Sequence, residues 1–335
     1  MTGTLLRGRT LSFRRWPETI DDHAAYAYEE DGALLIRSGK IVAAGPYAEV
    51  AKKAGEGVKT VDHRPHLILP GFIDTHVHFP QMQVIASYGA ELLDWLNTYT
   101  FPEEKKFRDA QHGRRIARLF LDEMVRHGTT STVAYCSVHK ASAEAFFEES
   151  HARDMLNIAG KVMMDRNAPD GVLDTPQSGY DDTKALISEW HGKGRQHVAI
   201  TPRFAITSSP EQMEMAGALV KEFPDLHMQT HLSENHAEIA YTCELYPEAK
   251  DYTDVYARYG LLGKKSLFGH SIHLSEREAD ALSDSGSVAV FCPTSNLFLG
   301  SGLFDYQRYR SREKPLRIAA ATDVGGGTNY SMLRT

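Results

Sequence analysis

Two histidines separated by a single residue are the clearest chemical feature of the sequence. His76 and His78 lie in a segment, 72–78, that follows Pro70-Gly71 and can run extended. Side chains two residues apart on a strand project to the same side, so both imidazoles can offer a ring nitrogen to one transition metal, of which zinc is the commonest. A His-x-His pair alone is a weak signal, because many such histidines are surface or hydrogen-bonded core residues. A metal site needs further ligands from elsewhere in the chain.

Further titratable residues recur where other apolar segments are expected to end as strands. These are Arg203, His231, Glu234, His270 and Asp323. These residues also have ordinary structural explanations. A histidine can be a hydrogen-bonded core residue, a glutamate can begin a helix, and an aspartate before glycines can cap a turn. Together they are explained more simply as a metal site. We predict four ligands, with a water molecule completing the coordination: His76, His78, His231 and Asp323.

Such a metal site suits hydrolytic chemistry. A zinc-type ion lowers the pKa of a bound water from about 15.7 toward about 7, so hydroxide forms at neutral pH. Glu234 lies three residues after His231 and is expected to shuttle a proton without binding the metal. We expect His270 and Asp323 to orient the nucleophile. Arg203 is always charged and suits a carbonyl oxygen or a developing oxyanion.

The elements that must position these residues alternate between apolar strands and amphipathic helices. We expect an opening strand from residue 67 and then strands at 130–136, 159–164, 198–202, 227–231, 266–270, 288–293 and 317–322. Helices are expected at 110–126, 141–156, 180–193, 209–222, 235–260 and 275–284. Eight strands over about 255 residues predict an α/β fold of the TIM-like (β/α)8 barrel type, whose catalytic residues lie at strand ends. A doubly wound sheet is the alternative, but no Gly-x-Gly-x-x-Gly follows the first strand.

The first part of the chain reads differently, as short strands separated by turns. We therefore predict a small β-sandwich-like domain over residues 1–66 and a barrel over residues 67–335. The sequence ends twelve residues after Asp323, which leaves no final barrel helix and no partners for the small domain. The expectation is that the C-terminal part of both domains is missing and that the chain is a fragment of a longer product.

Composition excludes several other classes of protein. A net charge of -7 without a dense Lys/Arg run argues against nucleic-acid binding. Three cysteines that lie far apart provide neither a disulfide framework nor a Cys-x-x-Cys site. No apolar stretch is long enough to span a membrane. A cytoplasmic location is the expectation.

Several motifs resemble the amidohydrolase superfamily, in its mononuclear deaminase branch, and within that branch the guanine deaminases. They are His76-Val-His-Phe-Pro-Gln81, Leu92-Leu-Asp-Trp-Leu96, Tyr99-Thr-Phe-Pro-Glu103, Thr201-Pro-Arg-Phe204, Gln229-Thr-His-Leu-Ser-Glu-Asn235, Cys292-Pro-Thr-Ser-Asn296 and Thr322-Asp-Val-Gly-Gly-Gly327. The resemblance covers essentially the whole chain. It implies hydrolytic deamination of guanine, a small purine base, by one Zn²⁺ per chain, and it suggests a homodimer.

The resemblance also implies roles for individual residues. Gln81, Arg203 and Phe204 are implied to contact the substrate together with His231, Glu234 and Asp323. Glu234, His270 and Asp323 are implied to act at the reacting water. Chemistry agrees, because an arginine can hold O6 of guanine, an amide can pair with the ring edge and an aromatic ring can stack on the purine. Trp95, Tyr88 and Leu92 could line the pocket or serve packing.

Other readings stay open at this point. Another mononuclear amidohydrolase, acting on adenosine-like or pyrimidine substrates or on triazines, would use the same ligands. A binuclear hydrolase fits less well, because no lysine stands at the end of the fourth strand to bridge two metals. A catalytically inactive scaffold should have lost a ligand, and none is lost. Fe²⁺ would accept the same ligands as zinc.

Overall fold

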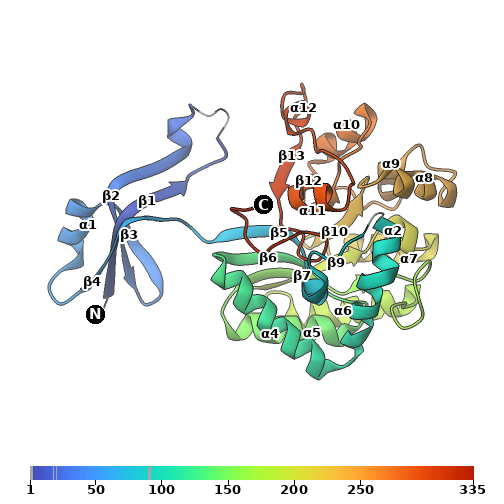
Figure 1. The fold of residues 1–335 in the computed structure, drawn as a ribbon, viewed down its shortest axis with the longest axis horizontal. Helices are drawn as coiled ribbons and strands as arrows, with labels where there is room; N and C mark the ends of the chain where they lie inside the picture. Colours follow the sequence, from blue (N-terminus) through green and yellow to red (C-terminus); the bar gives the residue numbers. More distant parts are fainter. Residues whose placement is uncertain (1–2, 18, 20, 90–91) are drawn as a thin grey trace. The chain divides into compact units, whose positions relative to one another are not determined.

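The computed structural model describes residues 3–17, 19, 21–89 and 92–335. Its contacts divide the chain into two compact units, with the boundary in the sequence between Gly71 and Phe72. The expected boundary lay between residues 66 and 67. The division falls later because the last residues of strand β4 (Lys59–Ile68) pair with strand β1 (Gly3–Phe13) of the small unit (Figure 1).

The small unit is one four-stranded sheet with the strand order β3-β2-β1-β4. Strand β1 pairs with β2 (Tyr26–Arg37) in antiparallel fashion and with β4 in parallel, and β3 (Lys40–Pro46) pairs with β2. Helix α1 (Tyr47–Ala54) buries Val50 and Ala54 against apolar side chains of this sheet. The expected β domain is therefore present, as a single sheet rather than two facing sheets in the part of the chain described.

The second unit contains the predicted barrel of parallel strands. Their order along the sheet is β13-β12-β11-β10-β9-β7-β6-β5, which follows the chain apart from the short β8 (Val162–Met163) beside β9. The bounds are β5 Phe72–His78, β6 Thr129–Tyr135, β7 Leu156–Gly160, β9 Gln196–Pro202, β10 His227–Leu232, β11 Ser266–His270, β12 Val288–Phe291 and β13 Arg317–Ala320. The (β/α)8 prediction is confirmed.

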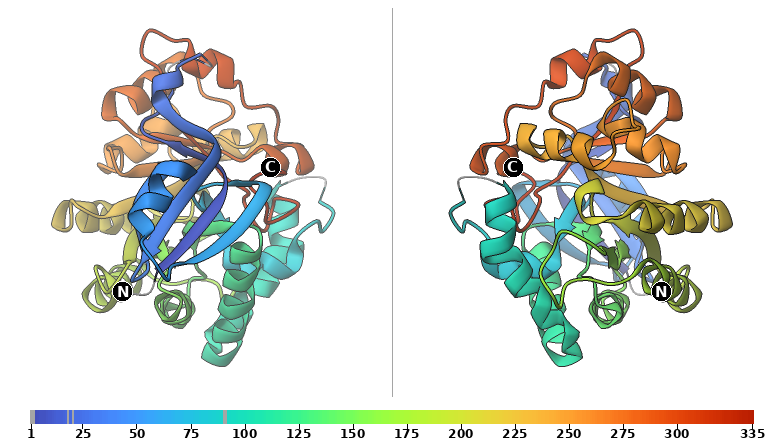
Figure 2. Two further views of the ribbon diagram at one scale, coloured as in Figure 1. Left: turned by 90° about the vertical axis from the view of Figure 1, so that its left-hand side faces the viewer. Right: turned by 90° about the vertical axis from the view of Figure 1, so that its right-hand side faces the viewer.

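Helices cover the outer side of these strands (Figures 1 and 2). The bounds of these helices are α4 Ala110–Arg126, α5 Lys140–Ala152, α6 Pro176–Trp190, α7 Pro210–Glu222 and α10 Glu276–Ser285. Two short helices, α11 Pro293–Phe298 and α12 Tyr306–Arg310, lie between β12 and β13 in the chain. The expected helix over 235–260 is wrong, because the chain forms α8 (His236–Leu245) and α9 (Tyr252–Arg258) instead. Pro247 follows α8, and the Asp251 side chain caps α9 by accepting a hydrogen bond from Asp254 N at 2.9 Å.

Residues just after β13 join the first barrel strand to the last. Asp323 N donates to His76 O at 3.0 Å, and His78 N donates to Val324 O at 2.9 Å. The buried Asp74 carboxylate accepts hydrogen bonds from Thr322 N at 3.0 Å and from Thr322 Oγ1 at 2.5 Å. These bonds place Asp323 directly beside the His-x-His strand.

Between β5 and α4 the chain forms a series of short helical turns. Their bounds are η2 Phe79–Val84, α2 Leu92–Trp95, η3 Leu96–Thr100, α3 Phe101–Glu104 and η4 Lys105–Arg108. Apolar side chains of this segment pack in the core, among them Phe79, whose ring centroid lies 5.3 Å from that of Phe107 and 5.1 Å from that of Phe146. The segment is therefore anchored over one end of the barrel.

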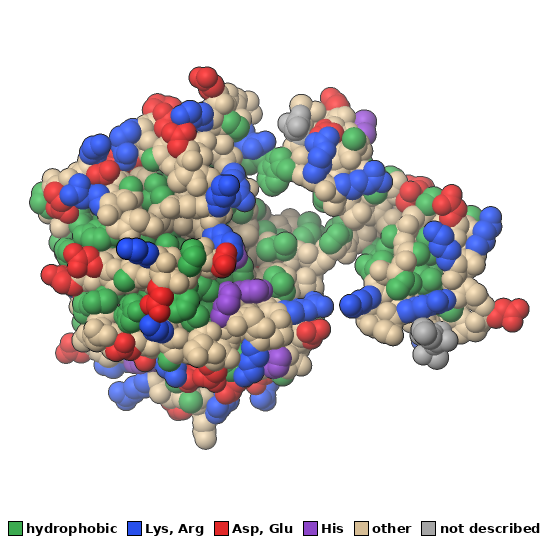
Figure 3. Space-filling model, turned by 180° about the vertical axis from the view of Figure 1, so that it is seen from behind, with side chains coloured by type: hydrophobic (Ala, Val, Ile, Leu, Met, Phe, Trp, Pro, Cys, Tyr) green, Lys and Arg blue, Asp and Glu red, His purple; other side chains and the backbone are tan. Residues whose placement is uncertain are grey.

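Two surface properties bear on function. In the described part of the chain, no helix is both long and apolar enough to cross a membrane. On the face shown in Figure 3, Lys and Arg side chains lie among Asp and Glu side chains, in keeping with the net charge of -7.

Candidate metal centre and substrate pocket

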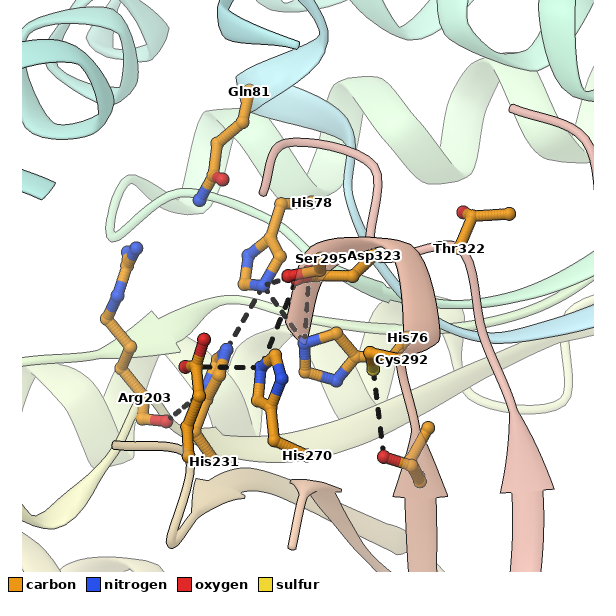
Figure 4. Close-up of polar contacts among 12 residues, drawn as sticks. His76, His78, Gln81, Arg203, His231, His270, Cys292, Ser295, Thr322 and Asp323 are labelled. Atoms are coloured by element: carbon orange, nitrogen blue, oxygen red, sulfur yellow. Dashed lines mark hydrogen bonds and ion pairs between the residues drawn. The ribbon is translucent and has the colours of Figure 1, made fainter. Parts of the chain in front are cut away.

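Three histidine rings converge at the ends of strands β5 and β10 (Figure 4). His78 Nε2 lies 3.2 Å from His76 Nε2 and 3.1 Å from His231 Nε2. Strand alternation brings the first two rings to the same side, as predicted. Gly269 on β11 leaves room for the His76 ring, because a Cβ at that position would lie 2.6 Å from His76 Cε1.

Asp323 completes this cluster. Its Oδ1 lies 3.4 Å from His76 Nε2 and 3.5 Å from His78 Nε2. Its Oδ2 accepts a hydrogen bond from Ser295 Oγ at 2.5 Å, which leaves Oδ1 facing the histidines. Burial raises the pKa of the Asp323 carboxyl to about 7, with no metal charge acting on it. The four residues that the sequence proposed as ligands thus lie together.

The protonation of His231 tests whether these residues suit a metal. His231 Nδ1 lies 2.7 Å from Arg203 O, and a carbonyl oxygen only accepts hydrogen bonds, so Nδ1 carries the proton and Nε2 offers a lone pair. Burial lowers the pKa values of His76, His78 and His231 well below their ordinary value, which keeps the rings neutral. A shared cation would stabilise such converging lone pairs. Two atoms that each bind one zinc ion at about 2.0–2.1 Å lie at most about 4.2 Å apart, and the spacings here are within that limit.

Glu234 and His270 form a second pair beside this cluster. Glu234 Oε2 lies 3.4 Å from His270 Nε2, and Glu234 Oε1 accepts a hydrogen bond from Ser301 Oγ at 3.0 Å. His270 Nδ1 donates to Asn296 Oδ1 at 2.9 Å, so its Nε2 is directed at the site. Burial raises the pKa of Glu234 to about 7, a value suited to proton transfer near neutral pH.

Backbone strain accompanies these positions. His270 and Asp323 have φ angles of 67° and 52°, and Ser233, next to Glu234, has a φ of 49°. Such left-handed conformations are costly for residues other than glycine and are typical of functional sites. They turn the chain sharply at the strand ends, where the side chains of Glu234, His270 and Asp323 reach the site.

A buried pocket opens beside the cluster. It is lined by His78, Gln81, Leu92, Trp95, Leu96, Arg203, Phe204, His231, Glu234, His270, Leu299, Asp323 and Gly326. Every residue proposed from the sequence to touch a substrate is therefore at this pocket. Of the three residues that could have lined it, Leu92 and Trp95 do, whereas Tyr88 is 78% exposed and does not.

Sequence reasoning missed several residues that hold the site in place. Glu104 lies behind Gln81 and Arg203 and accepts hydrogen bonds from both. Ser295 and Asn296 belong to the Cys292–Asn296 motif but were given no role of their own, and they bond to Asp323 and His270. Cys292 lies nearby, but its thiol faces Val290 O at 3.7 Å. The adjacent acids Glu103 and Glu104, directly after Phe101-Pro102, are a sequence signal that could have found the first of these.

Comparison with known proteins decides the family. A model of the amidohydrolase family matches residues 67–335. The chain belongs to the amidohydrolase family. Among its relatives, guanine deaminase of Escherichia coli K12 is 45% identical over 98% of this chain and 75% of the relative. A probable guanine deaminase of Deinococcus radiodurans is 40% identical over 91% of this chain and 70% of the relative. The chain thus falls among the guanine deaminases of this family, as its motifs indicated.

Solved structures agree with this family. E. coli guanine deaminase matches with a TM-score of 0.95 at 44% identity, over 99% of this chain and 77% of that one. The guanine deaminase of C. acetobutylicum, whose active site holds guanine, matches with a TM-score of 0.87 at 29% identity, over 98% of this chain and 76% of that one. The amidohydrolase fold is therefore present over nearly the whole chain.

Proposed function

We propose that the protein hydrolyses guanine to xanthine and ammonia, using one transition metal ion per chain. The observation that carries the proposal is one pocket lined both by three of the four candidate ligands, His78, His231 and Asp323, and by the Gln81–Arg203 pair. The relatives named as guanine deaminases support the choice of substrate, as does the bound guanine of the C. acetobutylicum structure.

We assign the metal to His76, His78, His231 and Asp323. When bound, the ion supplies a Lewis acid that acidifies a water molecule at neutral pH. Zinc is the ion we propose, because imidazole nitrogens and a carboxylate oxygen are ligands that it commonly takes, and Fe²⁺ is the alternative.

Gln81, Arg203 and Phe204 would hold the purine. Arg203 is a donor and suits O6 of guanine, and the Gln81 amide suits the neighbouring N1–H. Phe204 lines the same pocket, with its ring centroid 6.2 Å from that of His231, and would pack against the face of the base. Leu92 and Trp95 would exclude water from the other side.

Glu234 would move the protons of the reaction. Its carboxylate would take a proton from the attacking water and deliver it to a ring nitrogen. It would then take the hydroxyl proton of the adduct at C2 and deliver it to the departing amine. The pKa of about 7 suits both directions of transfer. His270 and Asp323 would hold the water in place by hydrogen bonds, and His270 Nε2 is free for that role because its Nδ1 is committed to Asn296.

Product analysis tests this proposal. Purified protein reconstituted with Zn²⁺ should convert guanine to xanthine and release one ammonia for each xanthine. Formation of another product, or no turnover by folded and metal-loaded protein, would contradict it. Two further expectations from the sequence belong to the proposal, a homodimer and a cytoplasmic location, and light scattering and cell fractionation would test them.

A further inference from the structure

Glu104 is a buried carboxylate that the proposed chemistry does not use. It is the last residue of helix α3, it is 1% exposed and it lies behind the two polar residues proposed to read the base. Its Oε1 accepts hydrogen bonds from Gln81 Nε2 at 2.7 Å and from Arg203 Nη1 at 2.9 Å. Its Oε2 accepts a second one from Arg203 Nη1 at 2.7 Å. One carboxylate therefore holds both residues.

The contact with Glu104 fixes which end of the Gln81 amide faces it. The oxygen and nitrogen of a glutamine amide are nearly the same size, so hydrogen bonding must decide the orientation. An ionised carboxylate paired with arginine only accepts hydrogen bonds, so the NH₂ group must face Glu104. Gln81 Oε1 lies on the other side, where Gly325 leaves room, since a Cβ there would come within 2.2 Å of that oxygen. The amide is held from both sides.

Arg203 is held in a corresponding way. One guanidinium nitrogen, Nη1, is committed to Glu104, and the guanidinium carbon lies 5.3 Å from the ring centroid of Phe101 on the same helix. Among the described residues, Nε and Nη2 of Arg203 have no hydrogen-bond partner. Figure 4 shows the polar ends of Gln81 and Arg203 pointing toward one another. The pair thus offers donors from Arg203 beside an acceptor from Gln81.

We propose that Glu104 is the positioning residue that sets substrate specificity, by fixing Gln81 and Arg203 as an acceptor and donor pair complementary to the 6-oxo, N1–H edge of a purine. The inference rests on the proposed function and deepens it. A 6-amino purine presents the opposite pattern, a donor at position 6 and an acceptor at N1. Such a base would face donor with donor and acceptor with acceptor. Sites built to hydrogen-bond one pattern reject the other strongly.

Glu104→Gln tests this inference, with Glu103→Gln as the matched control. Glu103 is the neighbouring residue on α3, and its carboxylate contacts Gln83 and Lys106 outside the pocket. The readouts are kcat and KM for guanine, and competitive inhibition constants for hypoxanthine, which has the 6-oxo edge, and for adenine, which has the opposite edge. Metal content and the melting temperature are measured for each variant.

In Glu104→Gln we expect the KM for guanine and the inhibition constant for hypoxanthine to rise by about 10- to 100-fold. The constant for adenine should stay unchanged or fall, because the neutral amide can turn and release Gln81. Glu104→Asp provides a second variant that keeps the charge next to Arg203. It is one methylene shorter and cannot reach both partners, so we expect a smaller loss of the preference for hypoxanthine over adenine.

Equal changes for hypoxanthine and adenine would overturn the inference, as would no change, or the same change in Glu103→Gln. If neither Glu104 variant folds, Glu104 is a structural residue and the inference is wrong. If wild-type protein does not deaminate guanine, the proposed function fails instead, and the inhibition constants then show separately whether the pocket prefers the 6-oxo edge.

Discussion

His231 donates its Nδ1 proton to the backbone carbonyl oxygen of Arg203 across 2.7 Å, which couples the candidate metal centre to the substrate side of the pocket (Figure 4). The bond sets the tautomer of the imidazole and leaves Nε2 as the metal-facing atom. Because the acceptor is a backbone atom, substitution of the Arg203 side chain should preserve it. The two halves of the site can therefore be changed separately.

Arg203→Met should keep one metal per chain and impair guanine turnover more than turnover of an analogue without the 6-oxo group. The variant leaves Glu104 as a buried carboxylate without its cation, so we expect the free energy of unfolding to fall by about 3–5 kcal/mol. Combining it with Glu104→Gln should restore part of that stability. Chemical denaturation of the single and double variants measures this. Equal losses of activity on both substrates would make Arg203 a structural residue.

Ser295→Ala should weaken metal binding without abolishing it. The Ser295 hydroxyl holds Asp323 Oδ2, and loss of such a supporting bond commonly costs about 10- to 100-fold in metal affinity. Competition with a chelator measures the change. Ser283→Ala, on helix α10 and bonded to Pro315 O, is the control and should behave as wild type. Unchanged affinity in Ser295→Ala would mean that Asp323 is held without this hydrogen bond.

Glu234→Gln should separate catalysis from metal binding. The substitution keeps the size of the side chain and its contact with Ser301 but removes the proton acceptor. We expect metal content to stay at one per chain while kcat falls by about 10²-fold or more. Wild-type turnover at full metal content would remove Glu234 from the mechanism.

The pH dependence of kcat/KM should report the same carboxylate. Burial raises the pKa of Glu234 from 4.5 to about 7, and the charge of a bound cation would pull it back down. Only the ionised form accepts a proton, so activity should fall as the pH falls through this pKa. We expect the midpoint of the acid limb between 4.5 and about 7. An acid limb with its midpoint at or below 4.5 would show that burial does not raise the pKa of Glu234 in the active protein.

The convergence of the candidate ligands could be predicted from the sequence because it follows from the geometry of strands. Alternation brings His76 and His78 to one side, and the carboxyl ends of parallel strands meet at one end of a barrel, where His231 and Asp323 belong. The choice of these four residues as candidate ligands required no knowledge of side-chain contacts. The fold class follows from the same alternation of strands and helices.

The supporting residues could not be predicted in this way. Glu104 lies on a short helix in an irregular segment, and its partners are 23 and 99 residues away in the sequence, so no local periodicity relates them. The domain boundary was misplaced for a similar reason. An apolar run at 67–69 suits a barrel strand as well as a small sheet, and only the pairing of Leu67 and Ile68 with β1 distinguishes the two.

Activity as a function of metal content tests the central claim most directly. Metal-free protein is titrated with Zn²⁺, and guanine turnover is measured at each step together with bound metal by elemental analysis. The account predicts that turnover rises in proportion to bound zinc and stops rising at one ion per chain, whereas His76→Ala binds no ion in the site and stays inactive. Turnover by metal-free protein, or activity that requires two ions per chain, would contradict it.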